Sequence, residues 1–246
     1  MNHLRWEIRS RMPEHLRRVA DSVAIIAEAV SRVPFVVAWS TGKDSTAMCH
    51  LVRAIAPETP IIIQFDDCDW PSKRPYYERV CRAQGWACTE VEPDFSVWDR
   101  MRAGRIGEED FCAQDHSLTR DAFLAPLDAA RRRHRCPGVF LGLRTAESRA
   151  RRVHLATRGR LYQITSGGWR CCPLAQWSAE DVFAYHVARG IEINPAYFNN
   201  RFRPPEEIRL SWAIPTPTSI RYGDAEHLRY YYPEQYRRTK EAVAWL

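Results

Sequence analysis

The chain has 246 residues, of which 45% are hydrophobic and 27% charged, as in ordinary globular proteins. No apolar run reaches the length of a membrane span and no secretory signal pattern opens the chain, so we expect a cytoplasmic protein with no membrane partner. The net charge of +6 is almost all arginine, since lysine occurs only at positions 43, 73 and 240. Eight cysteines without a Cys-x-x-Cys pair indicate reduced thiols rather than a disulfide framework or a zinc ribbon.

The first predicted elements are a helix, a buried strand and a second helix. Apolar residues recur at three- and four-residue steps over 13–33, which predicts a helix with Pro13 in its first turn. Residues 35–39 form a short apolar run typical of a buried parallel strand, and residues 46–55 carry one apolar helical face. The small-residue turn between them, 40–45, is of the kind that aims backbone N–H groups at a phosphate.

This turn reads Ser40-Thr41-Gly42-Lys43-Asp44-Ser45. It does not fit a Walker A loop, which needs glycine where Val37 stands and Ser or Thr where Asp44 stands. It closely resembles the PP-loop of the ATP pyrophosphatase-like superfamily, Ser-Gly-Gly-Lys-Asp-Ser, in the branch of phosphoadenylylsulfate (PAPS) reductases and the small subunit of ATP sulfurylase. An ordinary polar turn is the alternative.

The resemblance implies roles for the whole loop. Thr41 replaces the first glycine, and because a β-branched residue disfavours a positive φ, we expect the local backbone or the phosphate fit to differ. Lys43 and Asp44 are the catalytic candidates, and Asp44 is also a candidate Mg²⁺ ligand. The implied nucleotide-binding residues are Ser40, Thr41, Gly42, Lys43, Asp44 and Ser45.

Alternating strands and helices follow, and they predict the fold class. The expected strands are 61–65, 87–92 and 139–143, and the expected helices are 75–84 and 124–133. Repeated βα units predict an α/β fold with a doubly wound, mostly parallel sheet. The resemblance implies the Rossmann-like, adenine nucleotide alpha hydrolase-like form of it.

Carboxylates follow the strand at 61–65, where open α/β sheets bind ligands. Asp66 is therefore a further nucleotide-binding candidate, with a solvated acidic turn as the alternative. The resembling family carries an Asp-Thr-x-Trp-like signature here, and Asp66, Asp67 and Trp70 are similar to its remnants. The polar stretch 94–125, where that family has a variable insertion, adds three weaker candidates: Asp115, His116 and Arg120.

The strand expected at 139–143 runs directly into Gly142-Leu143-Arg144-Thr145-Ala146-Glu147-Ser148-Arg149-Ala150-Arg151-Arg152. This segment resembles the family's arginine motif, Gly-x-Arg-x-x-(Glu)-Ser-x-x-Arg. The resemblance implies contacts to the phosphate or sulfate end of a nucleotide, which suits planar guanidinium forks. Arg144 is a catalytic candidate as well, and Glu147 is expected to orient an arginine or help hold Mg²⁺. The implied nucleotide-binding residues are Gly142, Arg144, Ser148, Arg151 and Arg152.

Arginine density is highest between Arg131 and Arg160, where Glu147 is the only acidic residue. The patch favours phosphate or sulfate oxygens. It leaves open a mobile basic loop or a nucleic-acid surface instead.

A third block, Pro173-Leu174-Ala175-Gln176-Trp177, resembles the family's Pro-Leu-x-x-Trp, and Ser178 with Asp181 predicts a capped helix after it. We expect this block to be mainly structural, with Trp177 bordering the nucleotide. The predicted domains are a PP-loop PAPS reductase-like domain over 1–200 and an irregular or helical extension over 201–246. Aromatic and basic residues of that extension would dock on the core or stack on bases.

Together the motifs predict an enzyme that binds ATP or another adenylyl nucleotide with Mg²⁺. It would cleave ATP at the α-phosphate to adenylylate an unidentified acceptor or to support sulfur transfer. The family's reductases use a cysteine in the C-terminal tail, and this chain has none after Cys172. Cys171-Cys172 lies after the arginine motif without a later pair, so we predict buried spacers and no iron–sulfur cluster. The alternatives left open are an atypical PAPS or adenylylsulfate reductase or sulfotransferase, a non-catalytic nucleotide sensor, a nucleic-acid-modification component, and a homo-oligomer.

Overall fold

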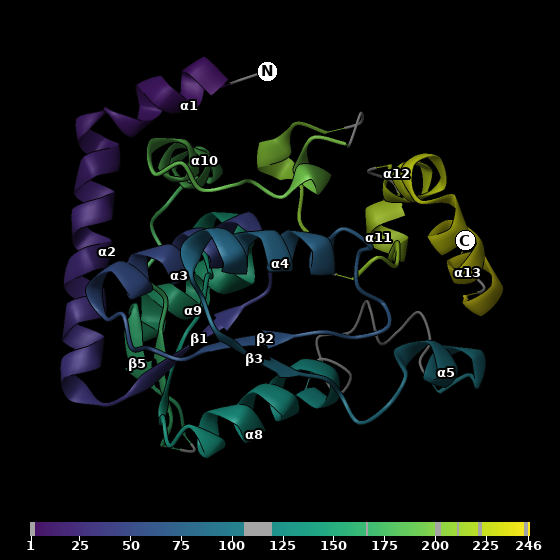
Figure 1. Cartoon of the computed structure of the whole chain (residues 1–246), viewed down its shortest axis with the longest axis horizontal. Coiled ribbons are helices and arrows are strands. Elements are labelled where there is room, and N and C mark those ends of the chain that lie inside the picture. Colours follow the sequence, from purple (N-terminus) through teal and green to yellow (C-terminus); the bar gives the residue numbers. More distant parts are fainter. Residues whose placement is uncertain are drawn as a thin grey trace. The chain divides into compact units, whose positions relative to one another are not determined.

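The computed structural model describes residues 3–105, 120–165, 167–199, 203–210, 212–220, 223–243 and 246. The larger elements, in chain order, are α1 (His3–Ser10), α2 (Pro13–Arg32), β1 (Phe35–Trp39), α3 (Lys43–Ile55), β2 (Ile61–Gln64), α4 (Lys73–Gln84), β3 (Cys88–Val91), α5 (Val97–Arg102), α8 (Ala125–Arg133), β4 (Gly138–Phe140), α9 (Arg149–Arg158), β5 (Leu161–Gln163), β6 (Trp169–Cys171), α10 (Ala179–Ala188), α11 (Pro217–Ile220), α12 (Asp224–Tyr231) and α13 (Pro233–Ala242) (Figure 1). A π-helical turn at Arg120–Leu124 and short 3-10 turns at Thr145–Glu147, Pro195–Tyr197 and Pro205–Glu207 complete them. None of the described helices is long and apolar enough to cross a bilayer.

The six strands form one sheet in the order β3-β2-β1-β4-β6-β5, which confirms the predicted α/β class. β1 pairs in parallel with β2 and β4, β4 pairs in parallel with β6, and β5 runs antiparallel to β6. Helix α3 packs against β1, while α8 runs on the other side of the sheet (Figure 1). Because β1 and β4 are parallel neighbours, the loops that leave their carboxyl ends emerge side by side.

The strands form where β-branched and aromatic residues can be buried. Val36, Val37 and Ile63 in the central strands are fully buried, as is Phe140 of β4. β4 is shorter than the strand expected at 139–143: Leu141 still donates its N–H to Cys171 at 2.8 Å, and then the chain leaves the sheet.

Two helices follow their sequence signals closely. α2 begins at Pro13 and ends at Arg32, with proline in the first turn, where its missing N–H costs no hydrogen bond. Ser178 caps α10, its side chain accepting from the backbone N–H of Asp181, and the Asp181 carboxylate accepts from the N–H of Ser178 in return. The capping box predicted from these two residues is confirmed.

Some described elements, among them α1, α9, β5 and β6, were not predicted as helices or strands from the sequence. The segment that becomes α9 follows the arginine motif directly, and Leu155 is its only buried residue among those described.

The chain divides into two compact units. The first combines Met1–Ile63, Glu78–Thr89 and Ala129–Ile193, and so contains β1, β4, β5 and β6 with helices α1, α2, α3, α9 and α10. The second combines Gln64–Tyr77, Glu90–Asp128 and Asn194–Leu246, with its own apolar cluster around Trp98, Met101 and Ile214. The domain boundary expected at residue 200 stays a prediction.

Candidate functional site

The loop after β1 is tied into the first turn of α3. This helix begins at Lys43, three residues earlier than expected, with Gly42 as its N-cap and a hydrogen bond of 2.9 Å from Thr46 N to Gly42 O closing the first turn. Ser45 Oγ accepts from Ser40 N at 3.2 Å and lies 3.1 Å from Gly42 O. Among the described residues no side chain caps this N-terminus, so its backbone dipole favours an anion.

Thr41 adopts the left-handed conformation, with φ 61°, and is 2% exposed. Threonine was expected to disfavour this conformation, and the structure imposes it nonetheless. For a residue with a Cβ the left-handed region costs roughly 1–2 kcal/mol, which the surrounding loop has to offset.

Gly142 brings the arginine motif against this loop. A Cβ built on Gly142 would lie 3.0 Å from both Cα and N of Ser45, closer than ordinary van der Waals contact. Only glycine therefore lets the chain leaving β4 pass this near to the first turn of α3.

Three charged side chains meet where the two loops touch. The Asp44 carboxylate accepts from Arg144 Nε through one oxygen, and its other oxygen lies 3.2 Å from Lys43 Nζ. Lys43 is 2% exposed and Arg144 4%. Burial lowers the pKa of Lys43, and the Asp44 charge opposes that effect. The cluster holds two cations against one carboxylate at the positive end of a helix.

Backbone carbonyls of the 173–177 block and a buried histidine hold this cluster in place. The carbonyl of Ala175 accepts from both the N–H and the hydroxyl of Thr145 at 2.9 Å, and the carbonyl of Trp177 lies 3.5 Å from Arg144 Nη1. His186 Nε2 lies 2.8 Å from the carbonyl oxygen of Lys43. His186 is fully buried, and burial lowers its pKa, so it acts as a neutral donor to the loop.

Trp177 itself is buried, its indole N–H donating to Ser22 Oγ at 2.9 Å. The block 173–177 thus supports Arg144 through backbone carbonyls. No period or charge pattern in the sequence signals such carbonyl contacts.

The rest of the arginine motif forms the start of α9. Glu147 accepts from the backbone N–H of Arg144 at 3.2 Å and pairs with Arg151, so it orients an arginine as expected. Ser148 caps α9, accepting from Arg151 N at 3.1 Å. Arg152 is exposed. The structure therefore brings Arg144 to the loop directly, Arg151 through Glu147, and leaves Arg152 at the surface.

Cys171 and Cys172 are fully buried, as predicted. Burial raises the pKa of both thiols, that of Cys172 to about 12. Neither is poised as a thiolate nucleophile.

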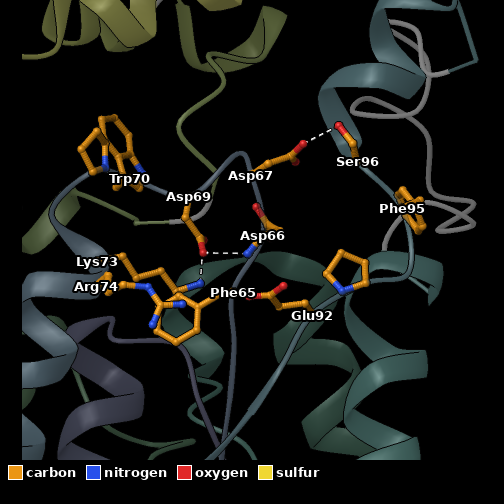
Figure 2. A pocket seen from close by; sticks show the side chains of 12 residues that line it. Phe65, Asp66, Asp67, Asp69, Trp70, Lys73, Arg74, Glu92, Phe95 and Ser96 are labelled. Carbon is orange, nitrogen blue, oxygen red and sulfur yellow. Dashed lines mark hydrogen bonds and ion pairs between the residues drawn. The ribbon is translucent and has the colours of Figure 1, made fainter.

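Asp66 belongs to the second unit, where it lines a hollow of about 480 Å³ walled by Phe65, Trp70 and Phe95 (Figure 2). Its carboxylate accepts from Trp212 Nε1 at 2.6 Å and from Cys68 N at 2.9 Å. Burial, with the nearby Asp69 charge, raises the pKa of Asp66 to about 6.

The neighbouring aspartates accept hydrogen bonds that stabilise the same loop. Asp69 accepts from Lys73 Nζ at 2.6 Å and from Asp66 N at 2.9 Å (Figure 2). Asp67 accepts from Val97 N at 3.1 Å. Asp66, Asp67 and Cys68 present ligand atoms close enough to share an ion. The two carboxylates already have a structural role, because they accept the hydrogen bonds described above. Asp115 and His116 lie outside the described residues.

The chain is similar to a known protein family and to named proteins. Residues 34–231 match the family model of the phosphoadenosine phosphosulfate reductase domain. A Shigella dysenteriae protein named sulfate adenylyltransferase subunit 2 is 27% identical over 207 residues, covering 74% of this chain and 67% of that protein.

Two solved structures share the fold. A Candida auris phosphoadenylyl-sulfate reductase in a phosphate complex superposes with a TM-score of 0.52 at 17% identity, covering 71% of this chain and 82% of that one. A Candida glabrata FMN adenylyltransferase, bound to FMN and an ATP analogue, gives a TM-score of 0.57 at 11% identity over 76% of this chain and 61% of that one. At such identities the likeness shows the fold alone.

Proposed function

We propose that this chain, which belongs to the phosphoadenosine phosphosulfate reductase domain family of the PP-loop superfamily, binds ATP or another adenylyl nucleotide and transfers its adenylyl group. The proposed site consists of the 40–45 loop, Gly142, Arg144, Ser148 and Arg151, with Arg152 reaching in from the surface. Asp66 belongs to the second unit, and its role as a nucleotide contact stays a prediction.

One observation carries the proposal: Asp44 pairs with both Lys43 and Arg144. Two distant sequence motifs thereby share one ionic cluster at the uncapped start of α3. A phosphate group offers more acceptor oxygens and more charge than a single carboxylate, and it can therefore replace Asp44 as the partner of the two cations.

The chemistry follows from where charge develops. Attack on the α-phosphate places negative charge on its oxygens and on departing pyrophosphate. Lys43, Arg144 and the loop N–H groups would stabilise that charge from positions fixed before the reaction. Arg144 is preorganised by the carbonyl of Trp177, and Lys43 by the bond between its own carbonyl and His186.

Mg²⁺ would be bound chiefly through the nucleotide. Both oxygens of Asp44 already interact with cations, and the Glu147 oxygen that faces Arg144 N is paired with Arg151. Mg²⁺ commonly binds through substrate phosphates with few protein carboxylates, so we assign no step to a metal at Asp44.

Adenylyl transfer is favoured over thiol-dependent reduction. The relative named sulfate adenylyltransferase subunit 2 and the structural neighbour named FMN adenylyltransferase are adenylyl-transfer proteins by name. Cys171 and Cys172 are buried thiols with raised pKa values, which argues against their serving a reductase. Localisation in the cytoplasm and the absence of an iron–sulfur cluster remain predictions.

Isothermal titration with ATP, AMP, adenylylsulfate and PAPS tests the proposal. We expect binding of at least one of them, weakened at least tenfold by Arg144→Lys, which keeps the charge but loses the guanidinium fork. Lys43→Met, close in shape, should also weaken binding, and thermal unfolding of each variant separates lost binding from lost folding. If the folded wild-type protein binds none of the four nucleotides, the proposal is wrong.

A further inference from the structure

Helix α2 buries two polar side chains and leaves an apolar seam at the surface. Its buried residues are His15, Ser22, Ile26 and Ala29. Five apolar residues, alternately four and three positions apart, lie outside that buried set; the first four are exposed and the fifth is half-buried: Leu16, Ala20, Val23, Ala27 and Val30. At about 100° per residue these five fall within an arc of about 80°, so they form one line along the helix, the α2 seam.

The large hydrophobic side chains that are exposed gather near this helix. Of the nine found in the described segments, five lie between residues 4 and 23: Leu4, Ile8, Met12, Leu16 and Val23. Leu16 is 54% exposed and Val23 38%. Single exposed hydrophobic residues are normal on a protein surface, whereas their concentration on α1 and α2 indicates an interaction surface.

The spacing of the α2 seam fits a second helix. Apolar residues alternately four and three positions apart repeat every 3.5 residues on average, which is the period at which two helices pack along their length. The two alanines of the seam have small side chains, so a partner helix can approach to the lower end of the usual 8–10 Å range. A helix that lies on a membrane surface needs a broad apolar face instead, and this seam is narrow.

We propose that α2 packs antiparallel against α2 of a second copy of this chain, with Val23 facing the partner's Val23. In this register Leu16 faces the partner's Val30, and each half of the seam covers the other half of the partner's seam. The contact is the same on both copies, so it closes as a two-fold dimer and leaves neither seam exposed.

Charges beside the α2 seam favour a second copy as the partner and fix its direction. Arg17 and Glu28 are exposed and stand 11 residues apart, which places them within about 20° of each other on one flank of the seam. In the antiparallel register each Arg17 lies beside the partner's Glu28, which gives two symmetric ion pairs. A parallel pair would bring like charges together. The existing pair of Glu28 with Arg32 joins two half-exposed side chains, so Glu28 can accept a second cation.

The test measures the mass of the full chain by sedimentation equilibrium between about 1 and 200 µM. The monomer mass is 28.6 kDa. The seam variant is Leu16→Glu/Val23→Glu. Its matched control is Leu124→Glu/Val153→Glu, which changes the same residue types at positions outside α2 that are 46% and 58% exposed. Each double variant lowers the formal net charge from +6 to +4, so net charge affects both equally.

We expect wild type to dimerise with a dissociation constant in the micromolar range, the seam variant to raise that constant at least a hundredfold, and the control to leave it unchanged. A wild type that is monomeric at about 200 µM would overturn the proposal and leave the seam to a different protein. Equal weakening by the two double variants would also overturn it, because the effect would then not be specific to α2.

Charge reversal tests the register. Arg17→Glu places two carboxylates opposite each other and should weaken the dimer about tenfold, whereas Arg17→Glu/Glu28→Arg restores opposite charges and should return the dissociation constant to within about threefold of wild type. These variants keep every side chain of the seam, so they test the proposal even if the seam variant fails to fold. If the double reversal dimerises no better than Arg17→Glu, the antiparallel pairing is wrong.

Discussion

Gly142→Ala tests whether close contact between the arginine motif and the loop creates the site. Gly142 does not have a positive φ, so alanine can adopt its backbone conformation without strain. The added Cβ would lie 3.0 Å from Ser45 Cα and N and 3.2 Å from Asp44 C. These are backbone atoms of the first turn of α3, and no flexible side chain can move aside to relieve the contact.

The size of the effect follows from that distance. Ordinary contact begins at 3.4 Å, so the loops must separate by about 0.4 Å (3.4 minus 3.0). Overpacking of this kind costs about 1–3 kcal/mol of unfolding free energy. The same movement carries Arg144 away from Asp44, and we expect nucleotide affinity to fall about tenfold, because bidentate contacts tolerate little displacement.

Urea unfolding and nucleotide titration measure the two effects. Gly168→Ala is the matched control: its Cβ would meet Arg170 Nη1 at 3.3 Å, the end of a flexible side chain, and we expect a change within about 0.5 kcal/mol. If Gly142→Ala unfolds at the wild-type urea concentration and binds nucleotide as wild type does, the two loops are not held by this contact and the reasoning fails.

Three other predictions concern single side chains. Thr41→Gly should raise the unfolding free energy by roughly 0.5–1 kcal/mol in urea, because relief of the positive φ exceeds the entropy cost of glycine; a loss of stability would contradict the strain. Asp181→Asn should cost about 3–5 kcal/mol, since the buried carboxylate accepts from His15 and Arg9. Burial alone would raise the pKa of Asp181, but these bonds and those from Ser178 hold the pKa well below its usual range. The contribution of Asp181 to the unfolding free energy should therefore be present above about pH 4 and be lost as the pH falls below it. The variant should lack this pH dependence of the unfolding free energy. Asp66 is the opposite case: burial raises its pKa to about 6, so its contribution should weaken as pH rises from about 4 to 6, and Asp66→Asn should remove that slope in pH-dependent unfolding.

The parts of the structure that sequence predicted are those encoded locally. Pro13 marks the start of α2, and the Ser178–Asp181 spacing marks the start of α10. The apolar run at β1 and the small-residue turn after it place the loop at the correct sheet edge. Each of these signals lies within a few residues of the feature that it specifies.

The parts that sequence did not predict depend on contacts between distant segments. Asp181 appeared only as a helix cap, yet it also accepts from Arg9 and His15, which precede it by more than 160 residues. No sequence motif marks His186, yet its Nε2 lies 2.8 Å from the carbonyl oxygen of Lys43. The fold determines which partner a buried polar side chain has, and a single sequence does not identify that partner.

The pairing of Asp44 with one neighbouring cation and one distant cation bears on how the site would work. Asp44, adjacent in sequence to Lys43, pairs with both cations and leaves one net positive charge among the three side chains, and it thereby limits the cost of burying Lys43 and Arg144 without a ligand. A nucleotide phosphate must then displace Asp44 rather than fill an empty cationic site. Binding energy comes from the difference between a phosphate and a carboxylate, together with the helix dipole and the N–H groups of the loop. Such a site discriminates by charge and oxygen number, and Asp44 would set the minimum charge that a ligand must carry.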